Sequence, residues 1–257
     1  MRASTIKNKP RDDKRYVLLS IGISIILWKV ISLWVGKSII IPSPEETIVA
    51  LISIIKNPEF SIAVYNTLKR IIIGFTFTFI LAVILGMVSG FYNPVYYILK
   101  PVVTVFKAVP TMAVILLALI WLESETAPIL VGFLVTFPLL YQNVVQGIVN
   151  IDKQLIEMAK IYKVGKIKMI REIYLPSIKS YLLAGISTAL GLTVKIVIAA
   201  EVLSQPKISI GTSFQMERAN INTAGVFAWA IIAIVIAGSF DILIKYAQKN
   251  TSGSYQK

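Results

Sequence analysis

The sequence predicts an all-α integral membrane protein with about six transmembrane helices, and three observations support this prediction. Hydrophobic residues make up 56% of the chain, charged residues only 15%, and the mean hydropathy is +0.76, far from the composition of a soluble domain. Six apolar runs each approach the ~20 residues that a helix needs to cross a bilayer. None shows the alternation of a membrane barrel strand. The runs cover residues 16–36, 71–91, 101–122, 127–149, 181–200 and 226–246.

Charge and residue content exclude several classes of function. The formal net charge is +13, but the lysines flank apolar runs and do not line one polar face, so we expect lipid and not nucleic acid as the surroundings. The chain has no cysteine and no histidine, which excludes disulfides, thiol nucleophiles, Cys/His metal sites and a Ser-His-Asp triad. We therefore predict no catalytic residue, no bound cofactor and no metal site.

The distribution of Lys and Arg between the runs predicts the orientation. The N-terminal tail has six, the second loop one, the fourth loop seven and the C-terminal end three, seventeen in all. The loops on the other side carry four, none and two. Because basic residues concentrate in cytoplasmic loops, both termini are expected in the cytoplasm. No small-residue cleavage site follows the first run, which predicts an uncleaved anchor.

The predicted organisation has five parts. These are a basic cytoplasmic tail at 1–15, a membrane anchor helix at 16–36, an outer loop at 37–70, a core of five helices at 71–247 that includes a loop at 150–180, and a cytoplasmic tail at 248–257.

The outer loop contains the pattern of a short amphipathic helix. Ser43 can cap it, Pro44 suits its first position and Glu46 completes a capping box. Ile48, Leu51, Ile52 and Ile55 recur at helical spacing until Asn57-Pro58 ends the pattern. This helix either lies on the lipid interface or receives a partner.

The loop at 150–180 predicts two short helices joined by a turn. Asn150 or Asp152 can cap the first, whose Leu155, Met158, Ala159 and Tyr162 share one face while Lys153, Glu157 and Lys160 lie on the other. Gly165 offers a break, Ile167, Ile170 and Ile173 form the apolar side of the second helix, and Pro176 marks the start of the fifth span. Two such helices make a docking surface that projects from the membrane.

The stretch "EMAKIYKVGKIKMIREIYLP" at 157–176 resembles the EAA loop of binding-protein-dependent ABC importer permeases. The family pattern is Glu-Ala-Ala, a Gly after three further residues, and then Ile-x-Leu-Pro. Met158 replaces the middle Ala and Lys163 stands at the family Gly position, so we expect Gly165 to provide the turn. The residues that the resemblance assigns to coupling with an ATPase are Glu157, Met158, Ala159, Lys163, Gly165, Ile173, Leu175 and Pro176.

The resemblance covers residues 38–247 and favours the nitrate, sulfonate, taurine and bicarbonate branch, through the strings "NTLKRIIIGF", "KAVPTMAVILLALIW", "VIAAEVL" and "SIGTSF". It implies the type I importer architecture, a homodimer in the bacterial plasma membrane, an extracytoplasmic solute-binding protein, and a separate cytoplasmic ATPase that holds ATP and Mg²⁺. The chain itself has no phosphate loop: "GKS" at 36–38 has Ile31 where the first glycine should be. The expected function is therefore inward transport of a small, anionic solute.

Charged residues inside the spans are candidates for the translocation path. Lys195 lies in the outer part of the fifth span with Glu201 six residues beyond. Lys195 either attracts an anionic solute or extends its amine to the interface as a lipid-facing lysine does. Lys107 and Asp241 have similar depths, which permits a pair.

Two alternatives remain open from sequence. Relatives with similar strings also carry vitamin or pyrimidine-type precursors, and no side chain discriminates among these solutes. An ion-coupled secondary transporter should show internal repeats and intramembrane acids, and neither is evident.

Overall fold

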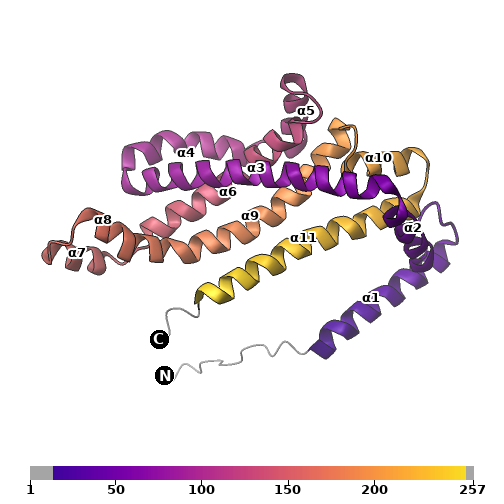
Figure 1. Ribbon diagram of the computed structural model, residues 1–257, viewed down its shortest axis with the longest axis horizontal. Helices are drawn as coiled ribbons and strands as arrows, with labels where there is room; N and C mark the ends of the chain where they lie inside the picture. The colour runs from indigo at the N-terminus through magenta and orange to yellow at the C-terminus, as the bar shows by residue number, and fades with distance from the viewer. Residues whose placement is uncertain (1–13, 253–257) are drawn as a thin grey trace.

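The computed structural model describes residues 14–252, and every regular element in this range is helical (Figure 1). The helices are α1 Lys14–Val35, α2 Pro44–Lys56, α3 Pro58–Phe91, α4 Asn93–Ala108, α5 Thr111–Trp121, α6 Ala127–Val149, α7 Lys153–Ile161, α8 Lys166–Met169, the π-helix η1 Ile170–Tyr174, α9 Leu175–Ser204, α10 Ile210–Ala219 and α11 Thr223–Ser252. The predicted all-α class is confirmed. The basic tail predicted at 1–15 falls largely outside the described residues.

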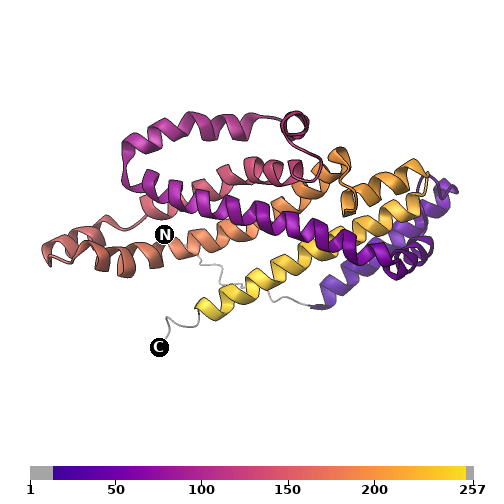
Figure 2. The ribbon, with the colours of Figure 1, turned by 45° about the horizontal axis from the view of Figure 1, so that its top comes forward.

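Helix α6 lies between α3 and α9, and these three form the central layer of the molecule (Figures 1 and 2). One threonine from each helix meets in its interior: Thr136 on α6 lies 3.4 Å from the hydroxyls of Thr78 and Thr193, and all three are fully buried. Each hydroxyl also bonds the carbonyl four residues earlier, so no buried polar group is left unpaired there.

Small residues allow these helices to approach closely, as expected for packing in lipid. A Cβ atom added to Gly86 would lie 2.8 Å from Val144, and one added to Gly90 would lie 2.6 Å from Ile148. On α9, a Cβ atom at Gly185 would lie 2.9 Å from the Cβ of Asn143. These glycines are therefore required for contacts with α6.

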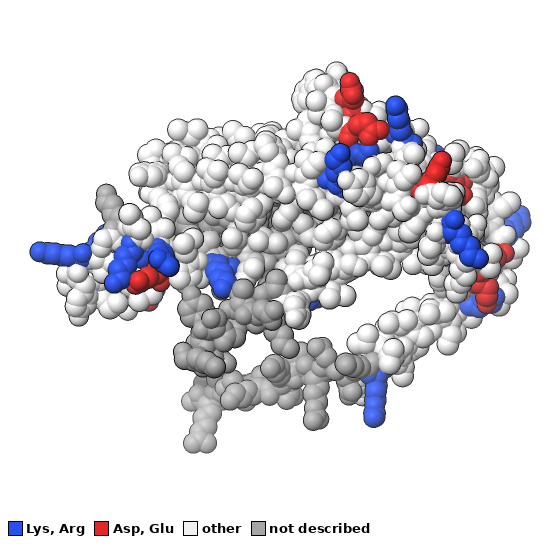
Figure 3. Space-filling view, in the orientation of Figure 1, with Lys and Arg blue, Asp and Glu red and all other residues white. Residues whose placement is uncertain are grey.

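The helices divide the molecule into two ends. The loop end carries α7, α8 and the connection from α3 to α4, and the cap end carries α2, α10 and the connection from α5 to α6 (Figure 1). Helix α1 runs toward the cap end and α11 runs away from it, so the start of α1 and the end of α11 both point away from the cap end (Figure 1). On the visible face, charged side chains gather at the two ends and are almost absent between them (Figure 3).

Five described helices are long and apolar enough to cross a membrane: α1, α3, α6, α9 and α11. The predicted third span at 101–122 is wrong as a single helix, because α4 and α5 meet at 101°. Pro110 explains the break, since it disfavours helical geometry at the preceding residue, and Val109 is extended with φ −69° and ψ 128°. The bent pair together makes a sixth crossing. Pro138, by contrast, does not break α6.

The outer loop predicted at 37–70 is shorter than expected. The capping box of α2 is confirmed: the Ser43 N–H donates to Glu46 at 2.7 Å, and the Glu46 N–H donates to the Ser43 hydroxyl at 3.2 Å. However, α3 begins at Pro58, where Asn57 caps it, so residues 58–70 are helical. Proline ends one helix here and, as a first-turn residue, also starts the next. At the other terminus α11 extends to Ser252, past the predicted boundary at 247.

Helix α1 stands apart from the central layer and contacts the rest only near its C-terminal end (Figure 2). There Trp28 donates from Nε1 to the Pro42 carbonyl at 3.0 Å and stacks on Phe227 of α11, and Lys29 pairs with Glu45 at 2.7 Å. The remaining apolar side chains of α1 are exposed, which is the surface that lipid or another membrane helix covers.

Candidate functional site: the loop end and the cap end

Helix α7 at the loop end is closed at both termini by local hydrogen bonds. Asp152 caps its start by accepting from the Gln154 N–H at 2.8 Å. At its end, the backbone N–H of Lys163 donates to the Lys160 carbonyl at 3.0 Å, and the backbone N–H of Val164 donates to the Ala159 carbonyl at 2.9 Å. This pair of bonds is the Schellman motif, which needs a left-handed residue at the position of Lys163.

Lys163 adopts that left-handed conformation, with φ 51°. The expectation that Gly165 provides the turn is wrong: Gly165 lies in the connection between α7 and α8, but its φ is not positive. The turn therefore stays at the position where the family pattern has glycine, and a lysine bears the conformational cost of ~1 to 2 kcal/mol.

The second short helix continues without interruption into the fifth span. Helix α8 passes into η1, whose wider turn is closed by the Leu175 N–H on the Ile170 carbonyl, and α9 follows at once. Pro176 lies in the first turn of α9 and has no N–H to give to the carbonyl four residues earlier, which accounts for the irregular turn before it. The predicted role of Pro176 as the start of the fifth span is confirmed, and α8, η1 and α9 form one continuous helical rod.

The loop end exposes apolar side chains together with basic ones. Ile161 and Tyr162 are each 77% exposed and Ile167 is 84% exposed. Of the predicted apolar face, Ala159 is buried, whereas Met158 and Leu155 are largely exposed. Glu157 is also exposed and has no ion pair with any described residue. Apolar groups of this size exposed beyond the membrane spans are typical of an interaction surface.

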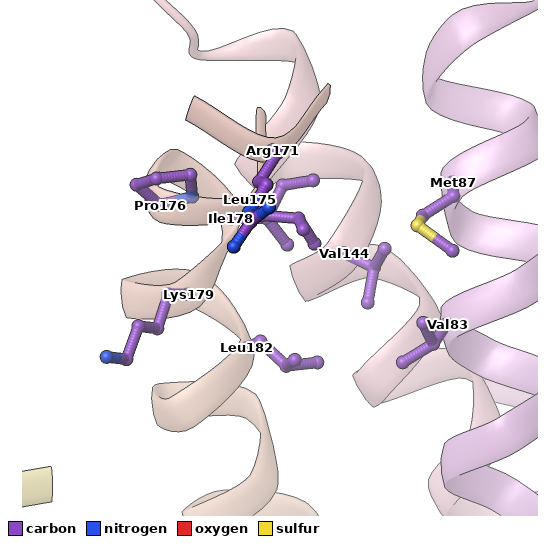
Figure 4. A pocket seen from close by; sticks show the side chains of 9 residues that line it. All are labelled: Val83, Met87, Val144, Arg171, Leu175, Pro176, Ile178, Lys179 and Leu182. Atoms are coloured by element: carbon purple, nitrogen blue, oxygen red, sulfur yellow. The ribbon is translucent and has the colours of Figure 1, made fainter. Parts of the chain in front are cut away.

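A cavity of about 350 Å³ lies behind the loop end, between α3, α6 and the start of α9 (Figure 4). Val83 and Met87 of α3 face Val144 of α6 across it, and Arg171 of η1 points toward its centre, whereas the Lys179 amine points away (Figure 4). Leu175 and Pro176, two of the predicted coupling residues, line the same cavity. Because of this cavity, η1 is not fully packed against α3 and α6.

The cap end is held by a buried ion pair. The Glu201 carboxylate, on α9, is fully buried and accepts from Arg70 Nη1 of α3 at 2.7 Å. Its other oxygen accepts from the Thr67 hydroxyl at 2.8 Å and from the Gly211 N–H at 3.2 Å. A buried charge is tolerated only when it is paired and fully hydrogen-bonded in this way.

The same arginine extends the network to the surface. Arg70 Nε donates to the Glu125 carbonyl at 3.1 Å, and Nη2 pairs with the Glu125 carboxylate, which also accepts from the Lys207 N–H at 2.9 Å. Partial burial raises the pKa of Glu125, but the Lys207 N–H and the Arg70 guanidinium outweigh it, and its pKa lies below the ordinary value. Arg70 therefore joins α3, the α5–α6 connection and α9, and through Glu125 also the segment before α10.

Gly211 permits the close contact of α10 with α9. A Cβ atom there would lie 2.3 Å from the Cβ of Glu201 and 2.5 Å from the Val202 nitrogen. Only glycine fits such an approach of two backbones.

The predicted path residues lie in different surroundings. Glu201 is buried in the Arg70 network, whereas Lys195 is exposed in an apolar groove between α9, α10 and α11 and forms no ion pair with any described residue. Lys195 and Glu201 remain predictions as path residues. The pair permitted between Lys107 and Asp241 does not form: Lys107 donates to Gln142 at 3.0 Å, and Asp241 pairs with Lys245 at 2.7 Å.

Sequence reasoning missed Thr67, Arg70, Glu125 and Gly211 as parts of one network. Arg70 was counted only as a loop cation, yet it directly precedes the apolar run at 71–91, and Glu201 directly follows the run at 181–200. A cation and an acid at the same depth of two adjacent spans could have indicated the pair.

The fold defines a multi-pass helical membrane protein whose cap end is held by a buried ion-pair network and whose loop end exposes apolar and basic side chains. Residues 79–253 match the family model described as the inner membrane component of binding-protein-dependent transport systems. The chain belongs to this family, and the resemblance inferred from the sequence is confirmed.

Curated relatives cover most of both chains. A probable ABC transporter permease of Brucella melitensis is 25% identical over 90% of this chain and 94% of its own. The putative aliphatic sulfonates transport permease of Bacillus subtilis is 26% identical, over 96% and 91% respectively. The taurine transport permease of Escherichia coli is 24% identical over 86% of each chain.

Proposed function

We propose that this chain moves a small anion inward as one half of a homodimeric permease, driven by a separate ATPase that docks on α7 and α8. The observation that carries this proposal is the construction of the loop end. It presents exposed Ile161 and Tyr162 at the surface, and a continuous helical rod leads from α8 to α9 in the core. A docked partner can therefore act on a membrane span directly.

Orientation follows from the bias of basic residues. The loop at 150–180 carries seven of the seventeen Lys and Arg residues assigned to one side, and the start of α1 and the end of α11 both point away from the opposite, cap end. The positive-inside rule places that side in the cytoplasm. There the ATPase, with its ATP and Mg²⁺, has access to α7 and α8, and the cap end faces an extracytoplasmic solute-binding protein.

The cavity behind the loop end provides room for the motion. Packed cores resist small shifts, but Arg171, Leu175 and Pro176 border empty space. When the ATPase closes, η1 can move into this space and carry the start of α9 with it. The homodimer is supported by the exposed apolar surface of α1.

The substrate class is supported by the relatives named for aliphatic sulfonates, nitrate and taurine. The test is uptake by proteoliposomes that contain the full chain, its neighbouring ATPase and the binding protein encoded with them. Labelled ethanesulfonate, taurine and nitrate should be tried in turn. ATP-dependent uptake of one of them is expected, with none when the ATPase carries a disabled nucleotide site. Uptake driven equally well by an ion gradient without ATP would contradict the proposal.

A further inference from the structure

A polar pocket of about 230 Å³ lies between α4 and α6, in the half of the molecule nearer the loop end. It differs from the cavity behind η1, whose lining is mainly apolar. The side chains that line it are Tyr96, Lys100, Val103, Thr104, Tyr141, Gln142, Val145 and Gln146.

The charge around this pocket has one sign. Lys100 lines it, and Lys107 on the same helix donates to the Gln142 amide oxygen at 3.0 Å. The sequence has no acidic residue between Glu59 and Glu123, nor between Glu125 and Asp152, so α4, α6 and most of α3 contribute none. A cation near hydrocarbon without a neutralising acid attracts an anion.

Tyr141 forms a wall of this pocket and does not offer it a free hydroxyl. The side chain is 2% exposed, and its hydroxyl interacts with the buried hydroxyl of Ser89. The polar groups that the pocket can offer to a solute are therefore the Lys100 amine and the Gln142 and Gln146 amides.

We infer that the pocket between α4 and α6 binds a small oxyanion, with Lys100 as its principal contact. Gln142 and Gln146 supply further amide donors, and the oxygens of a sulfonate or nitrate group are the acceptors that such a set fits. This inference rests on the proposed function, because it places the solute on the transport path.

The inferred site differs from the path through Lys195. Helices α4 and α11 lie on opposite sides of the α3–α6–α9 layer (Figures 1 and 2), and Lys195 lies in the groove beside α11. If the solute passes along α4, Lys195 does not line its path, and the Lys195 amine extends to the membrane–water interface.

The absence of native cysteine allows a direct test with Thr104→Cys in the full chain, held in phosphatidylcholine nanodiscs so that no anionic lipid competes. An anionic sulfonatoethyl thiosulfonate reagent and its cationic trimethylammonium analogue are compared at equal ionic strength. The anionic reagent should react at least several-fold faster. Ethanesulfonate or nitrate should slow it several-fold relative to chloride. Faster reaction with the cationic reagent, or equal protection by chloride, would overturn the inference.

Matched variants assign the effect to the pocket. In the Thr104→Cys chain, a further Lys100→Met change should abolish the faster reaction with the anionic reagent. The change Lys168→Met, which removes an exposed lysine of α8, should preserve it. Equal loss in both variants would mean that the preference comes from general surface charge and would refute a local site.

Uptake in the reconstituted complex separates the two hypotheses. ATP-driven uptake without anionic preference at Thr104→Cys would refute the pocket and leave the importer intact. Anionic preference without ATP-driven uptake would refute the importer and leave the pocket.

Discussion

The cap end and the loop end differ in how their charged side chains are paired. At the cap end Arg70 ties two carboxylates and three segments together, and Glu201 has a partner for both oxygens. At the loop end the backbone is capped, but Ile161, Tyr162 and Ile167 remain exposed. Exposed apolar side chains occur at both ends, for example Met216 and Ile221 at the cap end. The difference between the ends is therefore the buried charge network, which holds the helices of the cap end together within one chain.

The largest effect is expected from breaking the cap end. Arg70→Met leaves the Glu201 carboxylate buried without its cation, which typically costs about 3 to 5 kcal/mol. Thermal unfolding in nanodiscs should show a large fall in midpoint. The neighbouring Lys69 is exposed, so Lys69→Met is the matched control and should shift the midpoint little. Equal stability of the two variants would show that the network is not a stabilising element.

The next largest effect concerns association and not stability. Replacing Ile161 and Tyr162 together by serine should lower the affinity for the ATPase by tenfold or more, because each loses a large apolar contact. The unfolding temperature of the isolated permease should stay within the error, since both side chains already face solvent. Ile48→Ser with Ile52→Ser, on the exposed side of α2, is the control and should leave affinity unchanged.

A smaller effect is expected from Lys163→Gly. Glycine accepts the left-handed conformation without a steric cost but loses more entropy on folding, so a net gain of roughly 0.5 to 1 kcal/mol is expected locally. Slower hydrogen exchange at the Val164 N–H, which donates to Ala159, would show it. Faster exchange in the glycine variant would mean that the Schellman turn is not the stable form of the loop.

The smallest effect is the pH dependence of the cap end. Because the pKa of Glu125 is lowered in the folded protein, its contribution is present above the ordinary glutamate pKa of about 4.3 and is lost as pH falls through the folded value. The unfolding temperature should fall more steeply between about pH 5 and pH 3 in the native protein than in Glu125→Gln. Since Glu125 is half exposed, solvent screening keeps the difference small. Parallel profiles would remove Glu125 from the network.

Local patterns allowed correct predictions where the cause of a structure is local. The helix spans follow from apolar runs, and the capping box of α2 follows from Ser43 and Glu46, three residues apart. Even the left-handed turn lay at the family position, although the lysine there led the prediction to Gly165. In that case the two hydrogen bonds that close α7 outweigh the low preference of lysine for the left-handed conformation.

Features that depend on distant parts of the chain could not be predicted in the same way. The ion pair of Arg70 and Glu201 joins residues 131 positions apart, and the pocket between α4 and α6 exists only because α4 folds back along the central layer. The bend between α4 and α5 was within reach of the sequence, since Pro110 interrupts the run at 101–122. The prediction of one straight span gave more weight to the apolar content of this run than to Pro110.

The most direct measurement is site-directed cross-linking between the permease and its ATPase, using single cysteines in a chain that has none of its own. Tyr162→Cys probes the loop end, and Met216→Cys, on the exposed side of α10, probes the cap end. With a short bifunctional maleimide and an ATPase that carries surface cysteines around its docking cleft, Tyr162→Cys should form the heterodimeric product and Met216→Cys should not. Cross-linking at Met216 with none at Tyr162 would contradict the assignment of α7 and α8 as the ATPase-docking end.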